Sequence, residues 1–201
     1  ALPISGEFDI QERHMGLAKL PVFLENAKKG NYTVHLDPAL NGSDATIHIG
    51  NAYEGDPEIA KLLKNKDFRH ALSLGIDRDQ LNEAFWLGVG TPGSVAPAPD
   101  TIYSPGPEWN KKYATLDLKQ ANELLDKVGL TKKDPEGYRL RTDGKGRLRL
   151  ELVTVGGQFI PFTQVGEMIK QQWKKIGIDL DVKELERNLA FTRDNNNENQ
   201  M

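Results

Sequence analysis

The chain has 201 residues, of which 38% are hydrophobic and 27% are charged, and its formal net charge is −3. This length and balance suit one globular domain with its own core. Acidic and basic residues are interspersed, without the Lys/Arg stripe of nucleic-acid binders, so we expect no nucleic-acid partner. The chain contains no cysteine, which excludes disulfides, thiolate metal ligands and thiol nucleophiles.

The start of the chain carries no targeting signal. No run approaches the roughly 18 apolar residues of a membrane span, and no signal peptide precedes the first helix. The sequence opens on Ala1 rather than Met, so we expect a processed or excised segment.

The first third of the chain predicts one helix and two strands. Residues 17–29 have an apolar stripe at helical spacing, made by Leu20, Phe23, Leu24 and Ala27. Residues 32–36 and 45–50 are rich in β-formers and predict strands. Turn residues separate the two predicted strands.

Three aspartates then predict helix starts. Asp56 is followed by Pro57, a favoured first helical residue, and Asp67 and Asp77 precede apolar periodic segments. Residues 117–128 form a clear amphipathic pattern that ends at Gly129.

The last third of the chain predicts a βαβ unit. Residues 138–140 and 148–155 flank a turn at 142–146 and indicate a hairpin. A helix over 162–176 and a strand over 178–182 follow. The alternating basic residues of the hairpin predict a solvated strand face; they are Arg139, Arg141, Lys145, Arg147 and Arg149.

This order of elements predicts an α/β fold, a three-layer α/β/α arrangement with a mixed sheet. We assign residues 1–201 to a single domain. The proline-rich loop at 91–107 is long for a compact domain, so we expect it to be functional or held by its neighbours. Trp109, just after this loop, either covers a ligand or fastens the loop, whereas Trp86 and Trp173 are expected in the core.

Enzymatic chemistry finds little support in the residue inventory. His14, His35, His48 and His70 have no metal-ligand spacing, and no serine lies in a Gly-x-Ser-x-Gly context. We therefore expect no enzyme, no cofactor and no metal. A small α/β hydrolase, with a nucleophile and base brought together by the fold, stays as an alternative.

A binding function fits better, because ligands of open α/β sheets lie outside the carboxyl ends of the strands. That rule selects residues after three predicted strands: Asn51, Tyr53, Gly156, Gly157, Gln158, Glu186 and Arg187. Gly156 and Gly157 either bring backbone amides to a ligand or simply form a strand-to-helix turn.

Residues 65–78, Asn-Lys-Asp-Phe-Arg-His-Ala-Leu-Ser-Leu-Gly-Ile-Asp-Arg, resemble the signature of family 5 extracellular solute-binding proteins. Other pieces are similar to that family in the same order. They are Ser5–Asp9, Gly88–Pro92, Leu118–Gly129, Asp143–Leu152 and Gln172–Ile178. In the signature we expect Ala71, Leu72 and Ile76 to pack, and Arg69 and Arg78 to anchor carboxylates or carbonyls.

The resemblance implies one lobe of a two-lobed, type II periplasmic-binding-protein-like fold. The chain would supply the second lobe only, with the first lobe missing and the tail at 187–201 truncated before its return to that lobe. It implies binding of a small solute, a peptide or alternatively an oligosaccharide or nickel chelate, by hinge closure. It further implies delivery to the membrane permease of an ABC importer, an extracytoplasmic location, and a membrane-anchored lipoprotein parent. Arg193 falls where some members place an arginine that faces the cleft.

Overall fold

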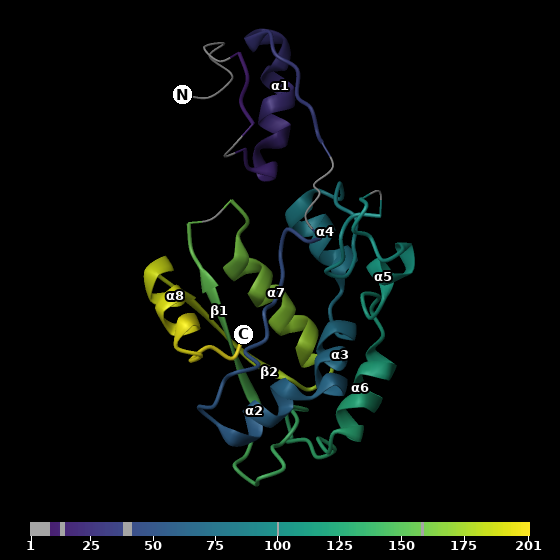
Figure 1. Ribbon diagram of the computed structural model, residues 1–201, viewed down its shortest axis with the longest axis vertical. Helices are drawn as coiled ribbons and strands as arrows, with labels where there is room; N and C mark the ends of the chain where they lie inside the picture. Colours follow the sequence, from purple (N-terminus) through teal and green to yellow (C-terminus); the bar gives the residue numbers. More distant parts are fainter. Residues whose placement is uncertain (1–8, 13–14, 38–41, 100, 158) are drawn as a thin grey trace.

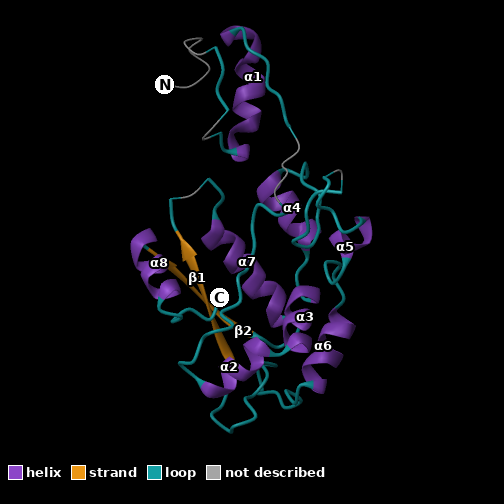
Figure 2. Ribbon diagram, in the orientation of Figure 1, coloured by secondary structure: helices purple, strands orange, loops and turns teal. Residues whose placement is uncertain are grey.

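The structure, a computed structural model, describes residues 9–12, 15–37, 42–99, 101–157 and 159–201. The turn η2 (Leu17–Lys19) precedes the first helix. The helices are α1 (Leu20–Gly30), α2 (Pro57–Lys64), α3 (Lys66–Leu74), α4 (Arg78–Trp86), α5 (Pro107–Lys111), α6 (Leu118–Lys127), α7 (Phe162–Lys174) and α8 (Arg187–Asn195). The strands are β1 (Arg149–Val155) and β2 (Asp179–Leu185). The predicted α/β class is confirmed (Figure 2).

The βαβ prediction is also confirmed. β1 and β2 are parallel neighbours, in register from Arg149 opposite Asp179 to Val155 opposite Leu185. A Cβ on Gly166 of α7 would lie only 3.1 Å from side-chain carbons of Leu152 and Val182, so α7 packs closely on one face of the sheet. α8 contacts β1, and it lies on the side of the strands away from α7 (Figure 1).

The sheet is smaller than the mixed sheet we expected. Residues 32–36 and 45–50 are irregular, so both early strand predictions are wrong. The chain end takes the place beside β1: the Val153 amide donates to the Met201 carbonyl at 2.8 Å, and the Gly50 amide donates to the Gln200 carbonyl at 2.8 Å. Residues 45–50 thus bond to the chain end without joining a regular ladder. The predicted hairpin reduces to isolated antiparallel bridges, one of them between Leu140 and Arg147.

Helix caps explain several element boundaries. Asp56 and Asp77 cap α2 and α4 as predicted, with side-chain oxygens that accept backbone amides. Asn65, rather than Asp67, caps α3, and Asp67 instead forms an ion pair with Lys127 at 2.6 Å. A cap must lie just outside the helix, and α3 begins one residue before Asp67.

The core lies between α7, the sheet and the α2–α3–α6 layer. Trp173 is buried there as expected, and its indole N–H donates to the Leu72 carbonyl at 3.0 Å. Trp86 is partly buried and packs against the core. Within the described ranges no helix is long and apolar enough to cross a membrane.

Arg139 overturns the prediction of a solvated basic strand face. Its side chain is 1% exposed and donates to the Ile176 carbonyl at 2.9 Å. It also donates to the Asn122 side chain at 2.7 Å, to Asp126 at 2.5 Å and to the Leu130 carbonyl. Because Arg139 precedes β1 instead of lying in a regular hairpin, strand alternation does not apply to it.

Candidate functional site

The carboxyl ends of β1 and β2 meet the start of α7, and we call this region the strand-end site. It contains Thr154, Gly156, Gly157, Thr163 and Glu184. The Thr154 and Thr163 hydroxyls are 3.0 Å apart, and the Thr163 hydroxyl also donates to the Glu184 carboxylate. These contacts fix Glu184 beside the first turn of α7.

Gly156 lies beside Glu184. A Cβ on Gly156 would displace the Glu184 carboxylate, whereas a Cβ on Gly157 would meet open space. Gly157 has a φ of +71°, which a residue with a side chain adopts only with strain. The two glycines therefore make the strand-to-helix turn and leave the backbone open on the outer side.

The start of α7 has no side-chain cap at Pro161, in contrast to α2, α3, α4, α6 and α8. The first amides of a helix have no partner within the helix. Amide donors at an uncapped helix start can bind carbonyl or carboxylate groups of a ligand. The Phe162 amide already donates to the Ile160 carbonyl at 2.9 Å, so the donors that the strand-end site offers beside Glu184 are the next amides in the first turn of α7.

Glu186 and Arg187 follow β2, whose last residue, Leu185, lies opposite Val155 of β1. The Glu186 carboxylate accepts the amides of Asn188 and Leu189 and so caps α8. These hydrogen bonds lower the pKa of Glu186. The Arg187 guanidinium lies 5.4 Å from the Phe191 ring centroid.

Arg193 lies farther along α8 and contacts the sheet. Its guanidinium donates to Glu151 at 2.8 Å, and the Lys183 ammonium donates to the other oxygen of the same carboxylate. Burial raises the pKa of Glu151, but the hydrogen bonds from Lys183 and Arg193 outweigh burial and hold that pKa below its ordinary value. The hydrogen bond to Glu151 raises the pKa of Lys183. Arg193 is therefore part of an ion triplet that joins α8 to β1 and β2.

Asn51 and Tyr53 follow a segment that bonds to the chain end: the Gly50 amide donates to the Gln200 carbonyl at 2.8 Å. The Asn51 side chain accepts a 3.5 Å hydrogen bond from Arg69, and Tyr53 packs against the core. Asn51 therefore contacts α3 and Tyr53 the core, whereas Gly156 and Gly157 lie at the strand-end site.

One predicted residue, Gln158, lies outside the described part of the chain. Four residues of this region were not predicted from the sequence: Thr163, Glu184, Glu151 and Lys183. Strand alternation could have found part of this set, since Glu151 lies on the strand face opposite Leu150 and Leu152. The predicted strand ended at residue 182, and β2 extends to Leu185, so Lys183 and Glu184 fell outside it.

The signature stretch is structural. The Arg78 guanidinium donates to the carbonyls of Ser73 at 3.0 Å and Ala114 at 3.1 Å, as expected for an arginine that anchors carbonyls. Burial lowers its pKa. The His70 ring stacks on Tyr113 with centroids 3.6 Å apart. These contacts hold the segment that follows the proline-rich loop against α3.

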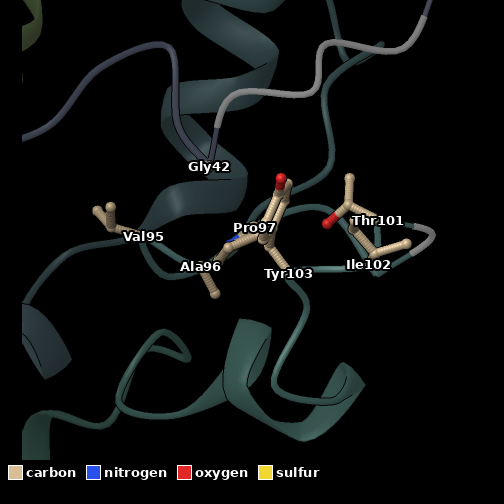
Figure 3. A pocket seen from close by; sticks show the side chains of 7 residues that line it. All are labelled: Gly42, Val95, Ala96, Pro97, Thr101, Ile102 and Tyr103. Carbon is tan, nitrogen blue, oxygen red and sulfur yellow. The ribbon is translucent and has the colours of Figure 1, made fainter.

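The proline-rich loop borders a pocket of about 610 Å³ that is separate from the strand-end site. In Figure 3, Val95 lies at one side of this pocket and Thr101 and Ile102 at the other, with Pro97 and Tyr103 between them. The loop is held by its neighbours as expected. Asn82 donates to and accepts from the Gly90 backbone, and the Ser94 amide donates to the Asn110 carbonyl at 2.6 Å. Trp109 helps fasten the loop through its carbonyl, which accepts from the Ser94 hydroxyl.

No group of three or more His, Cys, Asp or Glu side chains within the described ranges could hold a metal ion. An open glycine turn beside an uncapped helix start, at the carboxyl ends of parallel strands, is typical of a ligand-binding α/β domain.

The chain belongs to the bacterial extracellular solute-binding proteins, family 5, whose "Middle" model matches residues 1–201. A solved oligopeptide-binding protein, OppA, is 36% identical with a TM-score of 0.79, and the match covers 98% of this chain and 31% of that one. The periplasmic alpha-galactoside-binding protein of Rhizobium meliloti (strain 1021) is 30% identical over 155 residues, 70% of this chain and 21% of that protein.

The fold is also shared with MelB of Agrobacterium fabrum C58, a periplasmic binding protein solved with stachyose. That structure is 20% identical with a TM-score of 0.64, over 89% of this chain and 28% of the other. The chain thus spans less than a third of the length of these relatives. The relatives named here are binding proteins.

Proposed function

We propose that the chain supplies one lobe of a solute-binding protein that captures a peptide and delivers it to the permease of an ABC importer. The observation that carries this proposal is the similarity to OppA over 98% of the chain. The mechanism is closure of two lobes about a hinge, with no bond made or broken. The location would be extracytoplasmic, in a membrane-anchored parent.

The strand-end site gives this lobe its half of the ligand contacts. The amides at the start of α7 are suited to peptide carbonyls, and Glu184 is suited to amide or ammonium donors. Gly156 and Gly157 let a ligand backbone approach closely. The ion triplet of Glu151, Lys183 and Arg193 holds α8 in place beside the site.

An α-galactoside is the second candidate ligand, because the Rhizobium meliloti relative is 30% identical to this chain. Its hydroxyls would use the same donors and acceptors. Isothermal titration calorimetry of the full-length parent, with a tri- to pentapeptide mixture and with stachyose, distinguishes between the two candidate ligand classes. We expect peptides to bind at micromolar or lower concentration, and exclusive binding of stachyose would select the second candidate.

A single lobe makes half of the contacts and cannot close on a ligand, so the chain alone should show no micromolar binding. Thr163→Val in the parent removes the hydroxyl that positions Glu184 and should weaken peptide binding about 5- to 10-fold, the equivalent of one lost hydrogen bond. Thr192→Val is the matched control, since the Thr192 hydroxyl bonds only locally to the Asn188 carbonyl. Micromolar binding by the chain alone, or equal affinity of the two variants, would contradict the proposal.

A further inference from the structure

The stretch from the end of α6 to the start of β1 carries a surplus of positive charge. Residues 126–149 contain eight Lys or Arg and four Asp or Glu, in a chain whose formal net charge is −3. The stretch leads into Arg149, the first residue of β1, so it lies at the amino end of that strand. Figure 1 shows it at the end of the molecule away from the arrowhead of β1. A partner bound here would therefore leave the strand-end site open.

The four carboxylates of this stretch are all bound to arginines of the same stretch, with nitrogen–oxygen distances of 2.5–2.8 Å. The pairs are Asp126 with Arg139, Asp134 and Glu136 with Arg147, and Asp143 with Arg141. The guanidinium of Arg147 thus holds two carboxylates at once. Because the arginines occupy these groups, the lysines beside them are left without an acidic partner.

Three exposed lysines near Tyr138 form what we call the lysine patch: Lys132, Lys133 and Lys174. Among the described residues, no carboxylate lies within 4.0 Å of any of their ammonium groups. The Lys174 ammonium is 5.8 Å from the centroid of the Tyr138 ring. A Cβ on Gly177 would lie 3.4 Å from Cε of Lys133, so the Lys133 side chain runs beside the segment that follows α7. The patch thus joins two segments that are remote in the sequence.

Ordinary structural roles account for only part of the lysine patch. Lys174 is in the last turn of α7, where a cation interacts favourably with the helix C-terminus. Lys132 and Lys133 lie outside the helices and have no such role. Neighbouring cations without counter-charges repel one another, so an anionic surface that supplies the missing charge would lower their electrostatic energy.

We propose that the lysine patch docks on a membrane surface that carries anionic lipid headgroups. Protein–protein interfaces are depleted in lysine, and the arginines of this stretch, which bind carboxylates in a fixed geometry, are already occupied. Lysines on flexible stems suit a layer of mobile headgroups instead, which attracts basic residues within about a Debye length of the membrane. The choice of a membrane also rests on the proposed function, because the solute is delivered to a permease that lies in one.

Co-sedimentation of the 201-residue chain with lipid vesicles tests the docking. The anionic vesicles contain phosphatidylglycerol and phosphatidylcholine in equal parts, and the neutral ones contain phosphatidylcholine alone. At about 10 mM salt the chain should sediment with the anionic vesicles and not with the neutral ones. At about 150 mM salt, where the Debye length falls to about 8 Å, binding should weaken at least about 5-fold. Equal binding to both kinds of vesicle would overturn the proposal.

Two double variants with the same change of net charge test the place of docking. Lys132→Glu with Lys133→Glu should weaken binding to the anionic vesicles at least about 10-fold, since each lysine near an anionic surface adds to the attraction. Lys28→Glu with Lys29→Glu, at an exposed lysine pair on α1, should weaken it less than about 2-fold. Equal losses in the two double variants would overturn the proposal, because net charge alone would then explain the binding.

A soluble polyanion separates a membrane from an acidic polypeptide as the partner. Polyglutamate should compete only weakly for the chain, and binding of polyglutamate without binding of the anionic vesicles would overturn the proposal. Melting temperatures followed by circular dichroism should be equal, within about 2 °C, for the wild type and both double variants, since all four lysines are exposed. These assays need neither solute nor permease, so docking on vesicles fails or succeeds independently of peptide binding.

Discussion

Replacing Arg139 with alanine should destabilise this protein more than any change to its exposed charges. The guanidinium is 1% exposed and satisfies the buried carbonyls of Ile176 and Leu130. It also binds the side chains of Asn122 and Asp126. Each buried polar group that loses its partner costs about 1–3 kcal/mol, and breaking a buried ion pair costs about 3–5 kcal/mol.

We expect the Arg139→Ala loss to be about 4 kcal/mol rather than the full range, because Asp126 is 54% exposed and regains water. At about 3 °C per kcal/mol for a chain of this size, the melting temperature should fall by about 12 °C. The measurement is thermal unfolding followed by circular dichroism. Arg149→Ala is the control, since Arg149 pairs with Asp179 at 2.9 Å but is 63% exposed, and should cost at most about 1 kcal/mol. Equal shifts of the melting temperature in the two variants would show that burial does not decide how much each arginine contributes to the free energy of unfolding.

Two further changes test the ion triplet and the helix caps. The pKa of Glu151 is depressed in the fold, so the stability it contributes is present above its unfolded value of about 4.3 and is lost as the pH falls through the lower folded pKa. Glu151→Gln should therefore lower the melting temperature at pH 7, with a gap to wild type that narrows towards pH 3; a gap independent of pH would argue against the triplet. Asp77→Ala removes the cap of α4 and should cost about 1 kcal/mol, or about 3 °C. Asp79→Ala, in the first turn of the same helix, should cost less than half as much, and the reverse order in thermal unfolding would contradict the capping assignment.

The family and the chain order of the main elements could be read from the sequence because their signals are local. Asp77 caps α4 through an amide three residues away, and the βαβ unit follows from one amphipathic helix between two β-rich segments. The strand-end site was partly predictable for the same reason, because Gly156 and Gly157 follow β1 directly.

The tertiary structure decided everything that depends on a distant partner. Residues 45–50 have strand-like composition, but the Gly50 amide bonds to the Gln200 carbonyl of the chain end without forming a regular ladder. Arg139 reads as an exposed basic residue until Ile176 and Asn122, remote in sequence, surround it. Leu20 and Phe23 form a normal helical stripe, yet neither belongs to the hydrophobic core that unites the other elements. Caps and periodicity act within a few residues, whereas strand pairing, charge burial and membership of the core depend on which segments meet in space.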